Sequence, residues 1–115
     1  MNILSLTSGQ LRTFFSTVSS SAMTFVSVTT TNVVQKISSI MLANRTTNVL
    51  ATATVQIVSD GVTHPLCTGM NVDPEQQPAV VVDRTSPVYM TGTQTLQGSA
   101  SSTNVSVIVS YEELS

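Results

Sequence analysis

Apolar side chains recur at every second position of residues 49–57, and this alternation constrains the fold more than any other feature of the chain. Small or apolar side chains occupy every second position, with hydroxyl or amide side chains at Thr52, Thr54 and Gln56 and apolar ones at Val49, Ala51, Ala53, Val55 and Ile57. Successive side chains of a β-strand point to opposite faces, so the pattern predicts a strand that is buried on one face only.

The segment that precedes it, residues 37–43, is more continuously apolar, which is typical of a strand covered on both faces. Residues 44–48 between the two segments are polar, and the asparagines at both ends accept turn conformations. We therefore predict a long β-hairpin over residues 36–61, at the centre of an all-β domain.

Turn signals separate further short apolar segments along the rest of the chain. Asp60-Gly61 is typical of a type I′ hairpin turn, and Pro65 favours an edge position for the strand that follows. Additional strands are predicted over residues 23–34, 79–82, 88–96 and 105–111. Seven or eight short strands at intervals of 8–12 residues predict a single β-sandwich or jelly-roll-like domain over residues 23–115.

Residues 1–22 permit more than one interpretation. Leu11, Phe14, Phe15 and Val18 follow the spacing of an amphipathic helix, but the segment is also compatible with a strand or with an extended arm that lies on a neighbouring molecule. We predict an N-terminal arm or short helix. Its apolar residues are the candidate assembly contacts: Leu4, Leu6, Leu11, Phe14 and Phe15.

The chain carries unusually little charge. Only 9% of its residues are Asp, Glu, Lys or Arg, against about 25% in ordinary globular proteins, while it contains 17 Ser, 18 Thr and 17 Val. Soluble monomers usually remain apart because their surfaces are charged. So neutral a surface predicts that neighbouring subunits cover much of it, in a homo-oligomer or a larger assembly.

Several classes of protein are disfavoured by the same composition. The net charge of −2 and four scattered basic residues provide no basic stripe for nucleic acid. The apolar runs are far shorter than a membrane span, and the N-terminus lacks the pattern of a conventional export signal. We expect no nucleic-acid partner, no membrane insertion and, with one cysteine, no internal disulfide.

No group of residues has the spacing of a catalytic or metal site. His64 and Cys67 lie three positions apart, but a zinc site needs three or four ligands and the chain has no second His or Cys. The carboxylates at Asp73, Glu75 and Asp83 lack the spacing of a calcium loop. Asn44 and Asn104 begin glycosylation triplets, which are frequent by chance in so Ser/Thr-rich a chain. We expect no catalytic residues, no metal, no cofactor and no enzymatic activity.

Three segments resemble elements of small β-sandwich virion proteins of tailed bacteriophages. Residues 40–47 (IMLANRTT) are similar to their apolar strand followed by Leu-Ala-Asn-x-Thr-Thr. Residues 96–115 are similar to their closing hairpin and Ser-Tyr-x-Glu terminus, and residues 2–9 to their N-terminal arm. Residues 63–82 depart from the pattern, with a Pro-rich loop in place of a Gly-Ser turn.

The resemblance implies a non-enzymatic structural protein in the virion, with the major capsid protein or neck and tail proteins as partners. A capsid decoration (cement) protein is the leading expectation, and a head–tail neck or tail ring component is the alternative. A surface-adhesion sandwich that binds host glycan is the third, although the chain has no Trp and only two Tyr to form a sugar-stacking face.

Overall fold

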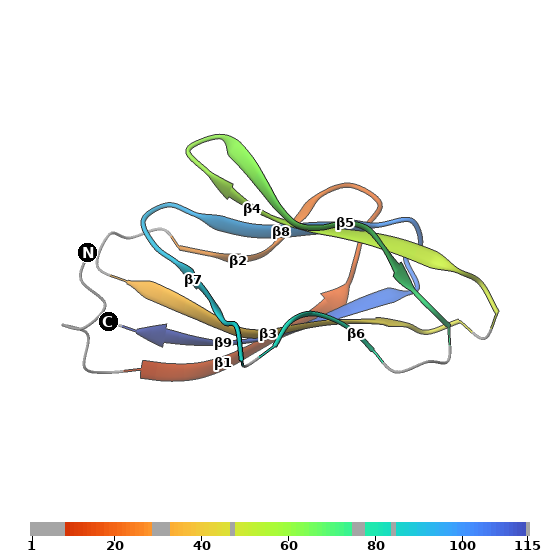
Figure 1. The fold of residues 1–115 in the computed structure, drawn as a ribbon, viewed down its shortest axis with the longest axis horizontal. Coiled ribbons are helices and arrows are strands. Elements are labelled where there is room, and N and C mark those ends of the chain that lie inside the picture. The colour runs from red at the N-terminus through yellow and green to blue at the C-terminus, as the bar shows by residue number, and fades with distance from the viewer. Residues whose placement is uncertain (1–8, 29–32, 47, 75–77, 84, 115) are drawn as a thin grey trace.

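The computed structural model describes residues 9–28, 33–46, 48–74, 78–83 and 85–114, and over these residues the protein is all-β. Nine strands form two antiparallel sheets that face each other as a sandwich with overall dimensions of 48 × 27 × 20 Å (Figure 1). The described chain contains no helix. The strands are β1 (Gly9–Thr17), β2 (Met23–Ser27), β3 (Val34–Asn44), β4 (Ala51–Ser59), β5 (Val62–Val72), β6 (Ala79–Val82), β7 (Val88–Met90), β8 (Thr95–Ala100) and β9 (Val105–Leu114).

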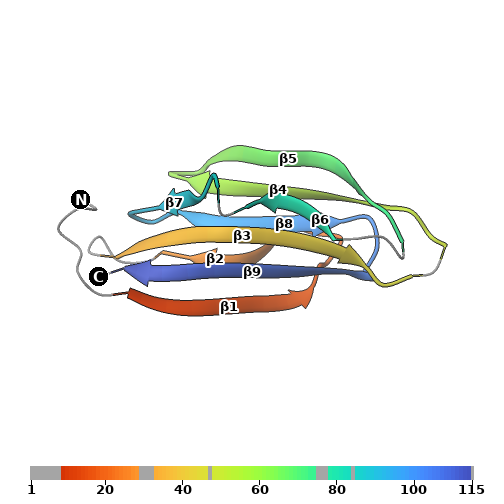
Figure 2. The same ribbon diagram turned by 60° about the horizontal axis from the view of Figure 1, so that its bottom comes forward.

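The two sheets take strands from both halves of the chain. Sheet A has the order β1-β9-β3-β6, with β7 also paired to β3, and sheet B has the order β2-β8-β4-β5. In Figure 2 β1 forms one edge of sheet A beside β9, and β5 forms one edge of sheet B beside β4. The fold is therefore a single β-sandwich domain, as the spacing of strands and turns predicts.

The core lies between the sheets and is built from alternate residues of each strand. Fully buried side chains come mostly from β3, β4, β8 and β9, with one each from β5 and β7. They include Ile37, Ile40, Leu42, Val55, Val72, Met90, Leu96, Val105, Val107 and Val109. An aromatic pair joins the sheets, because the ring of Phe14 on β1 stacks on the ring of Phe25 on β2 with centroids 5.8 Å apart. The alternation of residues 51–57 and 105–109 thus predicts the buried face correctly.

The predicted hairpin over residues 36–61 is wrong. β3 pairs with β9, β6 and β7 in sheet A, whereas β4 pairs with β5 and β8 in sheet B, so the segment between them crosses from one sheet to the other. A period of two places side chains on faces but does not choose the neighbouring strand. The crossing is held by Asn44, whose buried Nδ2 donates to the carbonyl oxygens of Val49 (2.7 Å) and Val72 (2.9 Å).

Arg45 fixes the same crossing to the loop between β8 and β9. Its backbone nitrogen donates to the carbonyl oxygen of Asn104 at 2.9 Å, and its guanidinium donates to the carbonyl oxygens of Asn104 and Thr103. The Leu-Ala-Asn-Arg-Thr-Thr element therefore has a structural role here. Its Asn44 side chain ties the end of β3 to the end of β5, and its Arg45 side chain ties it to the loop between β8 and β9.

Residues 9–17 form a strand of the sandwich, so a helix in this segment is wrong, and these residues are not a separate arm. β1 pairs with β9 along its whole length, and that pairing turns Phe14 into the core and leaves Leu11 and Phe15 outside. The spacing that resembles a helix arises because Phe14 and Phe15 point to opposite faces of one strand. Leu4 and Leu6 lie outside the described residues.

Of the other local predictions, the turn at Asp60-Gly61 and the edge position of Pro65 are confirmed, and the strand over residues 88–96 is wrong. Asp60 and Gly61 have φ angles of 52° and 77°, as a type I′ turn requires, and they join β4 to β5. Pro65 lies on β5, an edge strand of sheet B, as predicted. The single strand predicted over residues 88–96 is instead two strands, β7 in sheet A and β8 in sheet B.

Candidate assembly surface

An apolar row crosses the outer face of sheet A, the face that points away from the core. The strand register places Phe15 of β1 opposite Ile108 of β9, Ile108 opposite Met41 of β3, and Met41 opposite Val80 of β6. Side chains that face each other across neighbouring strands lie about 5 Å apart and contact one another. We call Phe15, Ile108, Met41 and Val80 the outer-face row.

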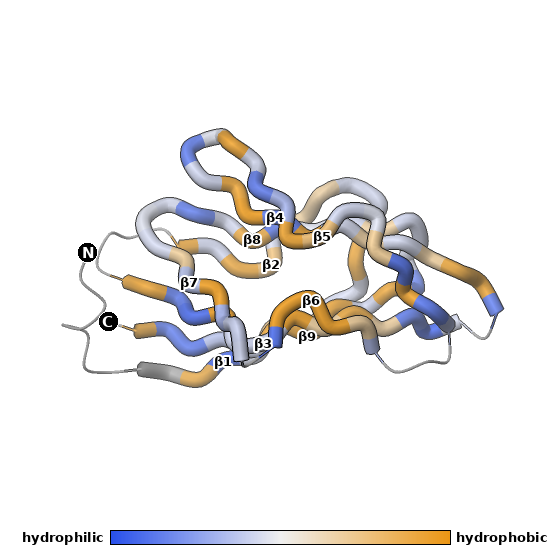
Figure 3. The backbone as a smooth tube through the Cα atoms, viewed as in Figure 1, coloured by the Kyte–Doolittle hydropathy of each residue, from blue (hydrophilic) through white to orange (hydrophobic). Residues whose placement is uncertain are grey.

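These side chains are accessible to a partner. Phe15 is 75% exposed, Val80 50% and Ile108 36%, and Met41 is partly buried. The described chain has eight exposed large hydrophobic side chains, and five of them lie on this face. They are Phe15, Val80 and Ile108 together with Leu11 and Tyr89. In Figure 3 the backbone is coloured as hydrophobic along β6 and along the adjacent part of β9. Such concentration on one face makes it the candidate interaction surface of the described chain.

The rest of this face is nearly uncharged. A row of hydroxyl side chains runs beside the outer-face row, with Thr13 opposite Ser110 and Ser110 opposite Ser39. The next row along the strands holds the two charged side chains of this face, Glu112 and Lys36, which lie opposite each other in the register. The face can therefore be covered without leaving an unbalanced charge away from water.

The outer face of sheet B has a different character. Its partly buried positions carry amide and hydroxyl side chains, including Thr54, Ser99, Gln56 and Gln97. Two of the amides pair with each other there, because Gln56 Nε2 donates to Gln97 Oε1 at 3.4 Å. Because the polar face interacts well with water, the apolar face of sheet A is the better candidate for contact with another protein.

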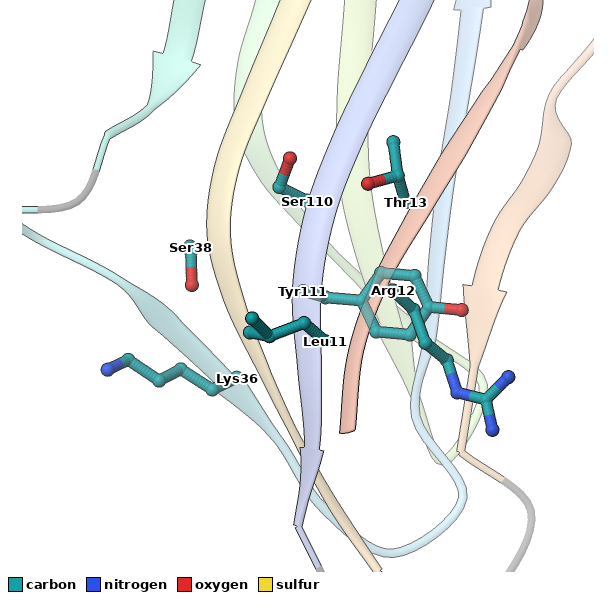
Figure 4. Close-up of a pocket in the computed structure, with 7 residues that line it drawn as sticks. All are labelled: Leu11, Arg12, Thr13, Lys36, Ser38, Ser110 and Tyr111. Atoms are coloured by element: carbon teal, nitrogen blue, oxygen red, sulfur yellow. The ribbon is translucent and has the colours of Figure 1, made fainter. Parts of the chain in front are cut away.

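A pocket of about 420 Å³ adjoins the outer-face row where β1, β9 and β3 run together. Seven residues line it: Leu11, Arg12, Thr13, Lys36, Ser38, Ser110 and Tyr111. In Figure 4 the charged ends of Lys36 and Arg12 point away from each other, so they do not converge on one ligand group. The register of β3 shifts between Ile37 and Ser39 beside this pocket, and such an irregularity interrupts the side-chain rows.

The lining of this pocket offers hydroxyl groups beside Lys36 and Arg12. Its Ser and Thr side chains have no imidazole or carboxylate among the lining residues to activate them. The chain's one histidine, His64, is exposed on β5 in the other sheet. The pocket is thus a depression beside the outer-face row, and His64 and the hydroxyl groups of its lining lie on different sheets.

The predicted assembly residues separate into two groups. Leu11 (86% exposed) and Phe15 lie on the outer face of sheet A, where they remain candidate contacts, whereas Phe14 packs inside against Phe25. The remaining contributors, Met41, Val80 and Ile108, were missed as contacts. The apolar run of residues 40–43 contained a signal: it predicts a strand covered on both faces, and the described residues cover Ile40 and Leu42 fully but Met41 and Ala43 only in part.

The residues weighed for chemistry are dispersed. Cys67 packs against the core, and desolvation by burial raises its pKa despite a backbone hydrogen bond from Val55, whereas His64 is exposed. Asp83 accepts hydrogen bonds from the Thr85 hydroxyl and backbone N–H, which lower its pKa. The described residues contain no group of three or more His, Cys, Asp or Glu that could hold a metal ion.

The two glycosylation triplets differ in accessibility. Asn44 is 9% exposed and its amide nitrogen donates two hydrogen bonds, so this side chain is occupied within the fold. Asn104 is exposed in the loop between β8 and β9. Only the second triplet therefore presents an accessible asparagine.

Comparison of the chain with models of protein families, with curated proteins and with solved structures finds no significant match. The described part of the chain also includes no helix of the length and apolarity needed to cross a membrane. The fold and the assembly surface therefore define the class of protein: an all-β sandwich with one apolar and one polar outer face.

Proposed function

We propose that the chain is a non-enzymatic structural protein of a tailed-phage virion, where it acts as a capsid decoration protein through subunit contacts. The observation that carries the proposal is the outer-face row, four apolar residues from four strands on a nearly uncharged face. Decoration requires a rigid module whose surface binds neighbours. A sandwich with one apolar outer face meets that requirement.

Two further features support this proposal. The chain has only 9% charged residues, which suits a protein whose surface is covered by neighbours. Its segments at residues 2–9, 40–47 and 96–115 resemble small virion sandwiches. In this proposal the partners are further copies of the chain and the major capsid protein.

The head–tail neck or a tail ring is the alternative location, and copy number distinguishes the two. Quantitative mass spectrometry of purified particles gives the ratio of this chain to the major capsid protein. A ratio that follows the capsid lattice supports decoration, whereas about six or twelve copies per particle would indicate a ring. Absence from purified particles would contradict the virion role altogether.

The contribution of the outer-face row can be tested with conservative changes. Ile108→Thr and Val80→Thr keep β-branched side chains, so the strands should form while the apolar contact is lost. Val62→Thr is the matched control, because Val62 is 54% exposed but lies at the hairpin of β4 and β5. The double variant should be folded and poorly incorporated into particles, and the control should be incorporated normally.

Host-glycan adhesion is the remaining class and would use the same face differently. Its exposed aromatic residues, Phe15 and Tyr89, lie on β1 and β7, which are separated in sheet A by β9 and β3. Two rings so placed do not form a continuous stacking platform for a sugar. Binding of the isolated domain to a glycan array would favour adhesion over decoration.

A further inference from the structure

β1 is a long edge strand whose one charged side chain, Arg12, is its only feature of the kind that opposes pairing. It lies at the end of sheet A, pairs with β9 over residues 9–17 with no shift of register, and contains no proline. Proteins normally block such an edge with a bulge, a proline, a lysine or a very short strand, because its free N–H and C=O groups bind another strand.

The other edges of the two described sheets have such protection. β5 contains Pro65 and two shifts of register against β4. β2 is five residues long with a shift against β8, and β6 and β7 have four and three residues. Among the edges of the two described sheets, β1 is therefore the one most open to pairing with another strand.

The backbone of β1 shows which residues would bind that partner. Val18, directly after β1, donates from its backbone nitrogen to the carbonyl oxygen of Val105 at 2.8 Å, and the register of β1 and β9 places these two residues opposite each other. Hydrogen-bonded pairs alternate along an antiparallel ladder. Residues of even number therefore bond to β9, and Leu11, Thr13 and Phe15 direct their N–H and C=O groups to the free edge.

We propose that two copies of this chain pair through β1, antiparallel, about a two-fold axis at Thr13. Thr13 is the middle residue of β1, so this register pairs every residue of the strand, and any shift leaves an end unpaired. Leu11 then lies opposite Phe15 of the second copy, and Phe15 opposite its Leu11. A two-fold contact requires this self-complementarity.

The side chains favour the same pairing. Leu11 and Phe15 are 86% and 75% exposed, and each contact across the axis covers one with the other on the outer face of sheet A. The outer-face row of each copy continues onto Leu11 of the next. A continuous sheet of two copies thus shields Leu11 and Phe15 of both copies from water.

Charge does not oppose the contact. Arg12 is the only charged residue of β1, and its Nε lies 3.3 Å from Oε2 of Glu113 on β9. In the proposed register Arg12 lies opposite Phe14 of the second copy, and the two arginines are diagonal, each beside its own glutamate. The inference deepens the proposed function and rests on it, because it names one of the subunit contacts.

Thr13→Pro tests the pairing in solution. The N–H of Thr13 faces the free edge, so proline removes a hydrogen bond between copies and none within sheet A. Sedimentation equilibrium should give a dimer for the unchanged chain at micromolar concentration and a monomer with the same circular dichroism for Thr13→Pro. An unchanged chain that remains a monomer up to about 100 µM would overturn the inference.

Cysteine cross-linking tests the register independently of that variant. Residues in a hydrogen-bonded antiparallel pair have Cα atoms about 5.5 Å apart, within the range for a disulfide. In a Cys67→Ala background, Thr13→Cys should oxidise to a covalent dimer at least about tenfold faster than Thr17→Cys, whose partner is residue 9 of the second copy. Equal rates would overturn the register.

The two proposals fail separately. Absence of the chain from particles would remove the virion role and leave the dimer measurable in solution. Normal incorporation of a monomeric Thr13→Pro chain would retain the virion role and overturn pairing through β1 as a contact within the particle.

Discussion

Asn44 Nδ2 donates a hydrogen bond of 2.9 Å to the carbonyl oxygen of Val72 and thereby joins the end of β3 in sheet A to the end of β5 in sheet B. The same side chain accepts from the Thr46 backbone and hydroxyl through Oδ1. One buried amide thus fixes the crossing of the chain between the two sheets.

Asn44→Ala should destabilise the fold by about 2–4 kcal/mol, because it leaves the buried Val72 carbonyl without its donor and opens a small cavity. Urea unfolding followed by circular dichroism measures the change. Asn104→Ala is the matched control, since Asn104 is exposed, and it should change stability by less than about 0.5 kcal/mol. Similar losses in both variants would contradict the role of Asn44.

Asn44→Asp should be destabilising in a pH-dependent manner. The carboxylate would be buried and would face the two carbonyl oxygens that the amide now donates to, so its pKa in the folded state would be raised. With a raised pKa, the variant keeps its stability at pH values below the ordinary pKa of aspartate. It loses stability as the pH rises through the pKa of the folded state. Unfolding midpoints between pH 4 and pH 8 should therefore fall with pH more steeply than those of the unchanged chain.

Gly98→Ala should destabilise the sandwich by about 1–3 kcal/mol through overpacking. A Cβ at Gly98 would lie 2.5 Å from Phe25 Cζ and 3.1 Å from the Thr54 carbonyl oxygen, and the Phe25 ring is held by its stacking on Phe14. Thermal unfolding measures the loss. Ser99→Ala, on the outer face, is the control, and Phe25→Leu should reduce the penalty of Gly98→Ala in a double-mutant cycle.

Cys67 should react slowly with thiol reagents at neutral pH. Desolvation raises its pKa above the ordinary value, which lowers the fraction of thiolate, and the side chain packs against the core. A chain with Cys67→Ala and Thr68→Cys moves the thiol to the adjacent exposed position and should react on the order of tenfold faster. Equal rates for the two chains would show that Cys67 is accessible.

Thr85→Val should raise the pKa of Asp83 toward its ordinary value, because it removes the hydroxyl that makes the largest contribution to lowering that pKa. Because the pKa of Asp83 is lower in the folded state than in the unfolded state, its carboxylate stabilises the fold at pH values above the unfolded-state pKa. That stabilisation is lost as the pH falls through the folded-state pKa. Carboxyl chemical shifts measured by NMR between pH 2 and pH 6 report the change. A titration unaltered by Thr85→Val would exclude the hydroxyl as the cause.

Much of the fold was predictable because its signals are local. Alternation identified the inward faces of β4 and β9, Asp60-Gly61 identified a turn, and Pro65 identified an edge. The candidate site was predictable only in part. Leu11 and Phe15 were identified as contacts, but Phe14 points inward, and Met41, Val80 and Ile108 come from strands whose order no local pattern specifies.

By itself the sequence located most of the strands and indicated which of their side chains avoid water, because both depend on neighbours within a few positions. It did not identify β1 as a strand of the sandwich or separate β7 from β8. Only the tertiary structure decided that β3 and β4 belong to different sheets, since every strand offers the same backbone donors and acceptors to any partner. That choice gathered Phe15, Ile108, Met41 and Val80 into one row. It also made Asn44 the link between the sheets and left β1 at an open edge.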